Sequence, residues 1–174
     1  MPENNISLSG GYTLESVART IGNAVLEPAF NFIQPKIASP NWGDRYIGMI
    51  AFGSIIDGPN SANIINIISG AYSDIIMMIN DPAPKVRQTV AFVFYKLSEF
   101  VPEIIFQSEA NLDLFINRCL EHIPEHHLIS TLVIGALKNL FVNSHRLNCP
   151  SLLNNYYKPI FLKLVETMYR DDIN

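Results

Sequence analysis

Residues 40–57 (PNWGDRYIGMIAFGSIID) and residues 82–99 (PAPKVRQTVAFVFYKLSE) are two copies of one pattern. The matching positions are Pro40 and Pro82, Arg45 and Arg87, Phe52 and Phe94, and Ile55 and Leu97. A third copy follows with its phase slipped by one residue, so that Val133 takes the place of Val90. The chain is therefore a tandem repeat, with a period of about 42 residues between Pro40 and Pro82.

Apolar residues within each copy recur at the spacing of an α-helix. The segment before Pro82 carries Ile64, Ile68, Ala71, Ile75 and Ile79 on one face. This spacing indicates helices with buried faces, and it outweighs the strand preference of the many Ile and Val residues. Proline and glycine turns separate eight predicted helices, near residues 11–22, 24–38, 42–57, 62–80, 84–101, 108–122, 126–143 and 151–169.

Helix pairs that repeat every 40–47 residues are typical of HEAT repeats. Each pair has apolar faces on two sides, and only neighbouring pairs can cover both. The sequence therefore predicts an all-α fold, an α-α superhelix (HEAT-repeat solenoid) of about four helix pairs. We expect residues 1–10 to be disordered and residues 11–174 to form the solenoid, with approximate units 11–39 (partial), 40–81, 82–124 and 125–174.

Composition excludes several classes of protein. Apolar residues make up 48% of the chain and charged residues 16%, which argues against a disordered segment. A net charge of −4 argues against binding to nucleic acid, which normally requires a basic surface. No uninterrupted apolar run reaches the roughly 18 residues of a membrane helix, so we expect no membrane insertion. Two cysteines are too few for a disulfide framework, which favours a reducing compartment.

The sequence contains no motif that indicates catalysis. A phosphate loop GxxxxGK[ST], HExxH, GxSxG and CxxC are all absent. The best metal candidate is the group Cys119, His122, His126 and His127, which would have to converge across the turn at Pro124. A buried thiol beside a polar loop explains these residues more simply. We therefore expect no enzyme, no metal and no cofactor.

Two arginines repeat just inside the second helix of a pair. Arg45 and Arg87 occupy this position, and Asp81 lies six residues before Arg87. An Asp–Arg ladder of this kind can order the stacking of units, although an exposed ion pair adds only about 0–1 kcal/mol. Ser39 stands where the first unit needs the aspartate, so we expect an incomplete ladder.

A curved stack of this kind presents one helix of every pair on its concave face. Such a face can bind a long flexible ligand through many modest contacts. Aromatic and acidic residues suit it to basic peptides, through cation–π contacts and charge pairing.

Specific stretches resemble the central HEAT repeats of the importin-β (karyopherin-β) family of nuclear import receptors. They are GNAVLEP at 22–28, NW at 41–42, MIAFGSIIDGP at 49–59, MIND at 78–81, VRQTVAF at 86–92 and KLSE at 96–99. The resemblance runs from about residue 12 to the end and weakens after Cys119. The family's chains are several times longer, so the sequence looks like an internal piece or a truncated relative.

The resemblance implies transport of protein cargo through nuclear pores and shuttling between cytoplasm and nucleus. Family members bind a basic helix of an adaptor, importin-α, on the inner face of these repeats. They bind the GTPase Ran and Phe-Gly nucleoporins largely through other parts of the chain. The alternative is a HEAT scaffold of another multiprotein complex, and a third candidate is a metal-dependent enzyme that uses Cys119 and the histidines.

The resemblance also carries over to single residues. Phe92 and Gly135 stand where the family has tryptophans that stack on basic side chains, and Glu99 and Asp57 match acidic positions. Lys96 and Asn139 complete the predicted concave-face set. The alternative is a purely structural role for these residues, in which Phe92 lies in the core, Glu99 is a solvated charge and Asp57 ends a helix. We expect Trp42 to pack between units and Arg45, Asp81 and Arg87 to be structural.

Overall fold

The computed structural model describes residues 6–169, and every regular element within them is helical. The α-helices are α1 (Ile6–Ile21), α2 (Leu26–Ile37), α3 (Trp42–Ile55), α4 (Ser61–Ile68), α5 (Tyr72–Met77), α6 (Pro84–Phe100), α7 (Glu103–Phe106), α8 (Glu109–His122), α9 (His127–Arg146) and α10 (Tyr157–Met168). Short 3-10 segments lie at η1 (Gly22–Val25), η2 (Ser69–Ala71), η3 (Met78–Asn80) and η4 (Pro150–Leu153). The predicted all-α solenoid is confirmed.

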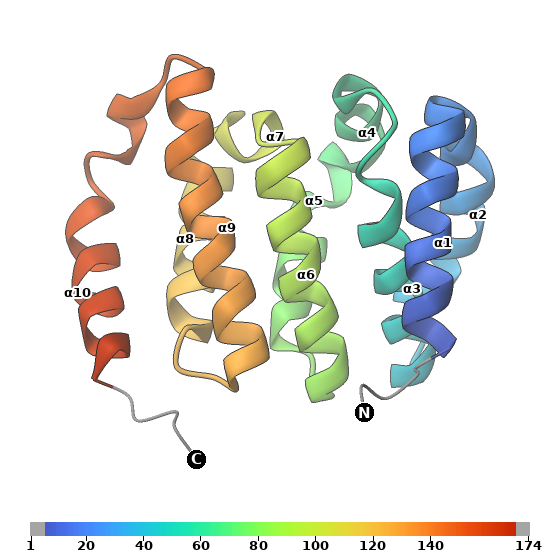
Figure 1. The fold of residues 1–174 in the computed structure, drawn as a ribbon, viewed down its shortest axis with the longest axis horizontal. Helices are drawn as coiled ribbons and strands as arrows, with labels where there is room; N and C mark the ends of the chain where they lie inside the picture. Colours follow the sequence, from blue (N-terminus) through green and yellow to red (C-terminus); the bar gives the residue numbers. More distant parts are fainter. Residues whose placement is uncertain (1–5, 170–174) are drawn as a thin grey trace.

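The helices stack in two layers (Figure 1). Helices α1, α3, α6 and α9 contact one another in that order and form what we call the inner layer. The outer layer contains α2, α4, α5, α7, α8 and α10, and α2 packs on α3 as α8 packs on α9. Each inner helix is thus followed along the chain by an outer segment of one or two helices, as the repeat requires.

A continuous apolar core fills the space between the layers. Phe52, Phe94 and Phe115 are among its largest fully buried side chains, and the rings of Phe94 and Phe115 lie 4.8 Å apart. Phe94 comes from α6 and Phe115 from α8, so this contact joins the two layers. Burial of such side chains, at about 1.5–3 kcal/mol each, is the main source of stability in a stack of this kind.

The turn after α3 explains why the AFGSIIDGP stretch needs glycine. Gly58 has a φ of +133°, and a Cβ there would lie 2.4 Å from the carbonyl oxygen of Ala18. The turn therefore rests directly on the backbone of α1. The side chain of Asn60 then caps α4, because its Oδ1 accepts a hydrogen bond from the backbone N–H of Ala62. The backbone N–H of Asn60 donates to Asn23 Oδ1.

Several boundaries differ from the predicted ones. Helix α1 begins at Ile6, so residues 6–10, expected to be disordered, are helical, while residues 1–5 lie outside the described part. The predicted helix 62–80 is interrupted at η2, where Gly70 lies. Before α8 the chain also forms α7, a single turn that the sequence did not suggest. In α10, Ile160 is the one buried residue, so this end helix is largely uncovered.

Within residues 6–169, one stretch, Ser61–Asn80, is long and apolar enough to cross a membrane by length and composition. It comprises α4, η2, α5 and η3 rather than one regular α-helix. The isoleucines of this stretch form part of the apolar core between the layers. The buried ones are Ile64, Ile68, Ile75, Ile76 and Ile79.

Candidate ligand-binding face of the inner layer

The exposed side of the inner layer contains a pocket of about 400 Å³. All four inner helices line it. The lining residues are Gly11, Tyr12 and Glu15 from α1, Tyr46, Ile50 and Ser54 from α3, Lys85, Gln88, Thr89 and Phe92 from α6, and Leu128 and Leu132 from α9. A concave site of this size is the default place for a ligand to bind.

Phe92 forms one wall of this pocket because α3 has a glycine opposite it. A Cβ on Gly53 would lie only 2.6 Å from Phe92 Cε1. The ring therefore lies against the α3 backbone and is half-buried. Phe92 thus takes part in packing between neighbouring units and still presents part of its surface to the pocket.

A buried lysine joins two helices that are not neighbours in the inner layer. Lys96 of α6 donates from Nζ to Glu15 Oε1 of α1 at 2.8 Å, across the intervening α3. The side chains of Lys96 and Glu15 are only 9% and 15% exposed. This ion pair ties α1 to α6 on the exposed side of α3, where the pocket lies. We call this hollowed side of the inner layer the concave face.

Phenyl rings surround the same ammonium group. Lys96 Nζ lies 4.9 Å from the ring centroid of Phe100 and 5.7 Å from that of Phe92. Both contacts have cation–π geometry. Lys96 was expected to face a partner, but it is buried and its charge is satisfied inside the chain. The cation-binding surface of Phe92 is thus partly used by the protein's own lysine.

Arg19 extends this ion-pair network toward the end of α3. It contacts Glu15 Oε1 at 2.7 Å and Asp57 Oδ2 at 2.6 Å. The hydrogen bond and charge of Asp57 raise the pKa of Arg19, with smaller support from Glu15 and Glu99. Asp57, predicted to meet a partner, therefore already holds an arginine, while Glu99 keeps an exposed side chain.

The other predicted positions lie where α6 meets α9. Asn139 donates from Nδ2 to Ser98 Oγ at 3.3 Å, so it joins the two helices. At Gly135, a Cβ would lie 3.0 Å from Tyr95 Cδ2. An aromatic ring from α6 therefore covers the position at which the resemblance leads one to expect a tryptophan.

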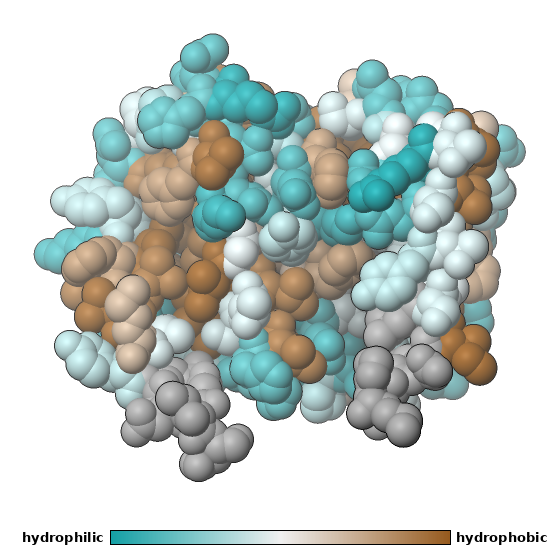
Figure 2. Space-filling model, viewed as in Figure 1, coloured by the Kyte–Doolittle hydropathy of each residue, from teal (hydrophilic) through white to brown (hydrophobic). Residues whose placement is uncertain are grey.

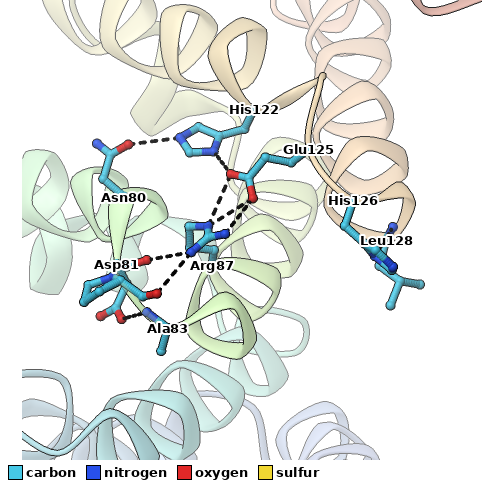
Figure 3. Close-up of polar contacts among 9 residues, drawn as sticks. Asn80, Asp81, Ala83, Arg87, His122, Glu125, His126 and Leu128 are labelled. Carbon is cyan, nitrogen blue, oxygen red and sulfur yellow. Dashed lines mark hydrogen bonds and ion pairs between the residues drawn. The ribbon is translucent and has the colours of Figure 1, made fainter. Parts of the chain in front are cut away.

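The predicted ladder is present, and it runs between units. Arg45 forms two hydrogen bonds with the Asp81 carboxylate, at 2.6 and 3.0 Å. Arg87 pairs with Glu125, Nη2 to Oε2, at 2.9 Å. Both arginines also donate from Nη1 to backbone carbonyls six residues earlier, those of Ser39 and Asp81. Ser39 thus contributes a backbone oxygen, and the ladder runs from Arg45 to Glu125. Figure 3 shows its part from Asp81 through Arg87 to Glu125.

The arginines of the ladder help to lower the pKa values of its carboxylates. Burial would raise the pKa of Asp81, but hydrogen bonds from Arg45 and the Ala83 amide outweigh it and lower that pKa. Burial likewise opposes the effect of Arg87 and His122 on Glu125, whose pKa is also lowered. Both groups are therefore ionised at neutral pH and favour the folded chain when ionised.

Two of the four metal candidates, His122 and Cys119, have contacts or burial that account for them without a metal. His122 contacts Glu125 through Nδ1 and Asn80 Oδ1 through Nε2, the latter at 3.0 Å (Figure 3). Cys119 is fully buried, and burial raises the pKa of its thiol. Within residues 6–169 there is no group of three or more His, Cys, Asp or Glu side chains that could hold a metal ion.

Trp42 lies elsewhere than expected. Its side chain is 48% exposed at the start of α3, and its ring lies 6.4 Å from that of Tyr46, one turn along the helix. Since Tyr46 lines the pocket, the exposed indole lies near the pocket and not between units.

Apolar residues also gather on this side of the molecule over α9 and α10 (Figure 2). The exposed large apolar residues of these two helices are Leu128, Val142, Tyr157, Phe161, Leu162 and Met168. Leu128 belongs to the pocket, and the α10 residues are exposed because, within the described residues 6–169, no inner helix packs over α10.

Sequence reasoning missed the contribution of α1. Gly11, Tyr12 and Glu15 line the pocket, and Glu15 holds the buried lysine. The spacing of Gly11, Leu14, Glu15 and Ala18 on one helix face was the available signal. Nothing in the sequence paired Glu15 with a residue 81 positions away.

Comparison with known proteins agrees with this architecture. No family model matches the sequence. The chain is 29% identical over 168 residues to importin subunit beta-1 of Saccharomyces cerevisiae, which covers 97% of this chain and 19% of the relative. It therefore spans about a fifth of the length of the curated relatives it matches.

Solved structures give the same result. Yeast importin-β (Kap95p) in complex with Nup1 superposes with a TM-score of 0.89 at 27% identity, covering 98% of this chain and 20% of the other. Kap95p described with RanGDP gives a TM-score of 0.88 at 28% identity, with the same coverage. In both sequence and fold, the chain is similar along almost its whole length to a segment that makes up about a fifth of importin-β.

Proposed function

We propose that the chain is a non-enzymatic segment of a nuclear import receptor and that it binds a basic adaptor or cargo helix on the concave face of its inner layer. The similarity to importin-β over 97% of the chain carries this proposal. On this basis the protein shuttles between cytoplasm and nucleus. Contacts with Ran and with Phe-Gly nucleoporins would involve parts of a receptor beyond this segment.

The geometry supports the concave face as the binding surface. Glu99 is exposed on α6, two turns beyond Phe92, where it can pair with a lysine or arginine. Phe92 and Tyr95 supply aromatic surface on the same helix. The contribution of Asp57 is smaller, because a ligand has to compete with Arg19 for its carboxylate.

Binding of an importin-α-type basic helix, measured by fluorescence anisotropy at two salt concentrations, tests the proposal. We expect affinity to fall with added salt and to fall further in Glu99→Lys. Asp74→Lys is a matched control, because Asp74 is an exposed acid on α5 in the outer layer. If the helix does not bind, or if the two variants bind equally, the adaptor proposal is wrong.

The alternative of a HEAT scaffold in another complex shares the fold and differs in the partner. Affinity purification that recovers subunits of such a complex, and neither importin-α nor nucleoporins, would favour it.

A further inference from the structure

We propose that the pocket beside Phe92 is an anchor site for an amphipathic helical segment of a partner protein. The segment inserts one apolar side chain into the pocket and pairs a neighbouring carboxylate with Lys85. This goes beyond the proposed function, because it adds a contact of opposite charge to the basic one on the same face. It holds whether or not the partner is an import adaptor.

The first argument is that the acidic and aromatic groups of the pocket already hold cations of the chain itself. Two charged residues line it, Glu15 and Lys85. Glu15 Oε1 already accepts hydrogen bonds from Lys96 and Arg19, at 2.8 and 2.7 Å. Phe92 already has Lys96 over its ring. A basic side chain of a ligand would have to displace one of these internal cations.

The second argument is that apolar surface in the pocket remains open. Ile50, Leu132 and Phe92 are among the residues that line it. Leu128 at the rim is 43% exposed. A volume of about 400 Å³ accommodates a leucine or a larger apolar side chain. Burying such a side chain is favourable by itself, without any charged partner.

The third argument is the charge that remains. Lys85 is exposed, and among residues 6–169 no ion pair engages its ammonium group, whereas Glu15 has two. A carboxylate beside the apolar anchor would complement Lys85 and would also lie near the N-terminus of α6, where negative charge is favoured.

Helix geometry then sets the direction of the bound segment. Lys85, Phe92 and Glu99 follow one another at intervals of seven residues and lie on one face of α6. The two charges are about 20 Å apart along the helix, with the aromatic ring midway. A segment lying along α6 would therefore place its acidic end at Lys85 and its basic end at Glu99.

Designed peptides test this with the full chain. The first probe is a labelled alanine-based helix with one central leucine and a glutamate one turn away; a second has alanine for leucine, and a third has lysine for glutamate. We expect the leucine probe to bind about tenfold more tightly than the alanine probe. Lys85→Glu should weaken the glutamate probe by about two- to fivefold and strengthen the lysine probe.

Lys138→Glu is the control, since Lys138 is exposed on α9 and does not line the pocket. Leu128→Trp, at the rim, should weaken both leucine-containing probes by filling the opening. Circular dichroism shows whether each variant is folded. Equal binding of the leucine and alanine probes, no binding of any probe, or equal effects of Lys85→Glu and Lys138→Glu would overturn the proposal. Failure of Glu99→Lys to affect the basic helix would count against the proposed function alone.

Discussion

The ion pair between Lys96 and Glu15 gives a sharp test of how the concave face is held. Removing the charge of Glu15 leaves the ammonium of a lysine that is 9% exposed with two ring faces and no carboxylate. Removing the charge of Lys96 leaves Glu15 paired with Arg19. The two substitutions break the same bond, so a difference between them measures what remains around each partner.

The magnitudes follow from burial. Breaking a fully buried pair from one side costs about 3–5 kcal/mol, and breaking an exposed pair costs about 0–1 kcal/mol. This pair is mostly buried, so Glu15→Gln should lower the free energy of unfolding by about 2 kcal/mol. Lys96→Met keeps an apolar stem beside the rings and should cost less than about 1 kcal/mol.

Urea unfolding followed by circular dichroism measures both variants and the double variant. The double variant should cost about as much as Lys96→Met alone, because the glutamine no longer leaves a buried charge unpaired. Equal costs for the two single variants, or additive costs in the double variant, would refute this account of the network.

Three further outcomes are expected, each checked by the same unfolding measurement. A Cβ at Gly53 would lie 2.6 Å from Phe92, so Gly53→Ala should destabilise the fold by about 1–2 kcal/mol. Gly10→Ala has open space around it and should stabilise the fold slightly, and a Gly10→Ala variant less stable than Gly53→Ala would contradict the packing. Trp42→Ala should cost less than about 1.5 kcal/mol because the ring is half-exposed, against about 3–5 kcal/mol for the buried Phe94→Ala. Since the folded pKa values of Asp81 and Glu125 are lowered, their stabilisation of the folded chain is complete above the unfolded values near pH 4 and is lost as pH falls through the folded values. Asp81→Asn should therefore flatten the fall of the free energy of unfolding at acid pH, and an unchanged slope of that free energy against pH would contradict this.

The fold followed from the sequence because its determinants are periodic. The 42-residue spacing from Pro40 to Pro82 and the isoleucine stripe from Ile64 to Ile79 repeat locally and require no knowledge of distant neighbours. Helix ends were less accurate, since Gly70 interrupts a stripe that continues on both sides, and helix α1 begins within a segment that was expected to be disordered.

The candidate site could be predicted only in part. Phe92 and Glu99 are on the predicted face, but the partner of Lys96 lies 81 residues away, so no spacing rule could show that this lysine is buried. Glu125 takes the place of the ladder aspartate but lies two residues beyond the position that the 42-residue period gives, which hid it from the repeat alignment. Trp42 was expected to pack between units because aromatic side chains are usually buried, and its exposure depends on how neighbouring units stack, which is a tertiary property.

Hydrogen–deuterium exchange of the full chain, with and without an importin-α-type basic helix, tests the central claim most directly. Slower exchange on ligand binding is expected in the inner helices around Phe92 and Glu99, with α2, α5 and α8 of the outer layer unchanged. Protection confined to the outer layer, or none at a ligand concentration that saturates binding, would contradict the concave face as the binding surface.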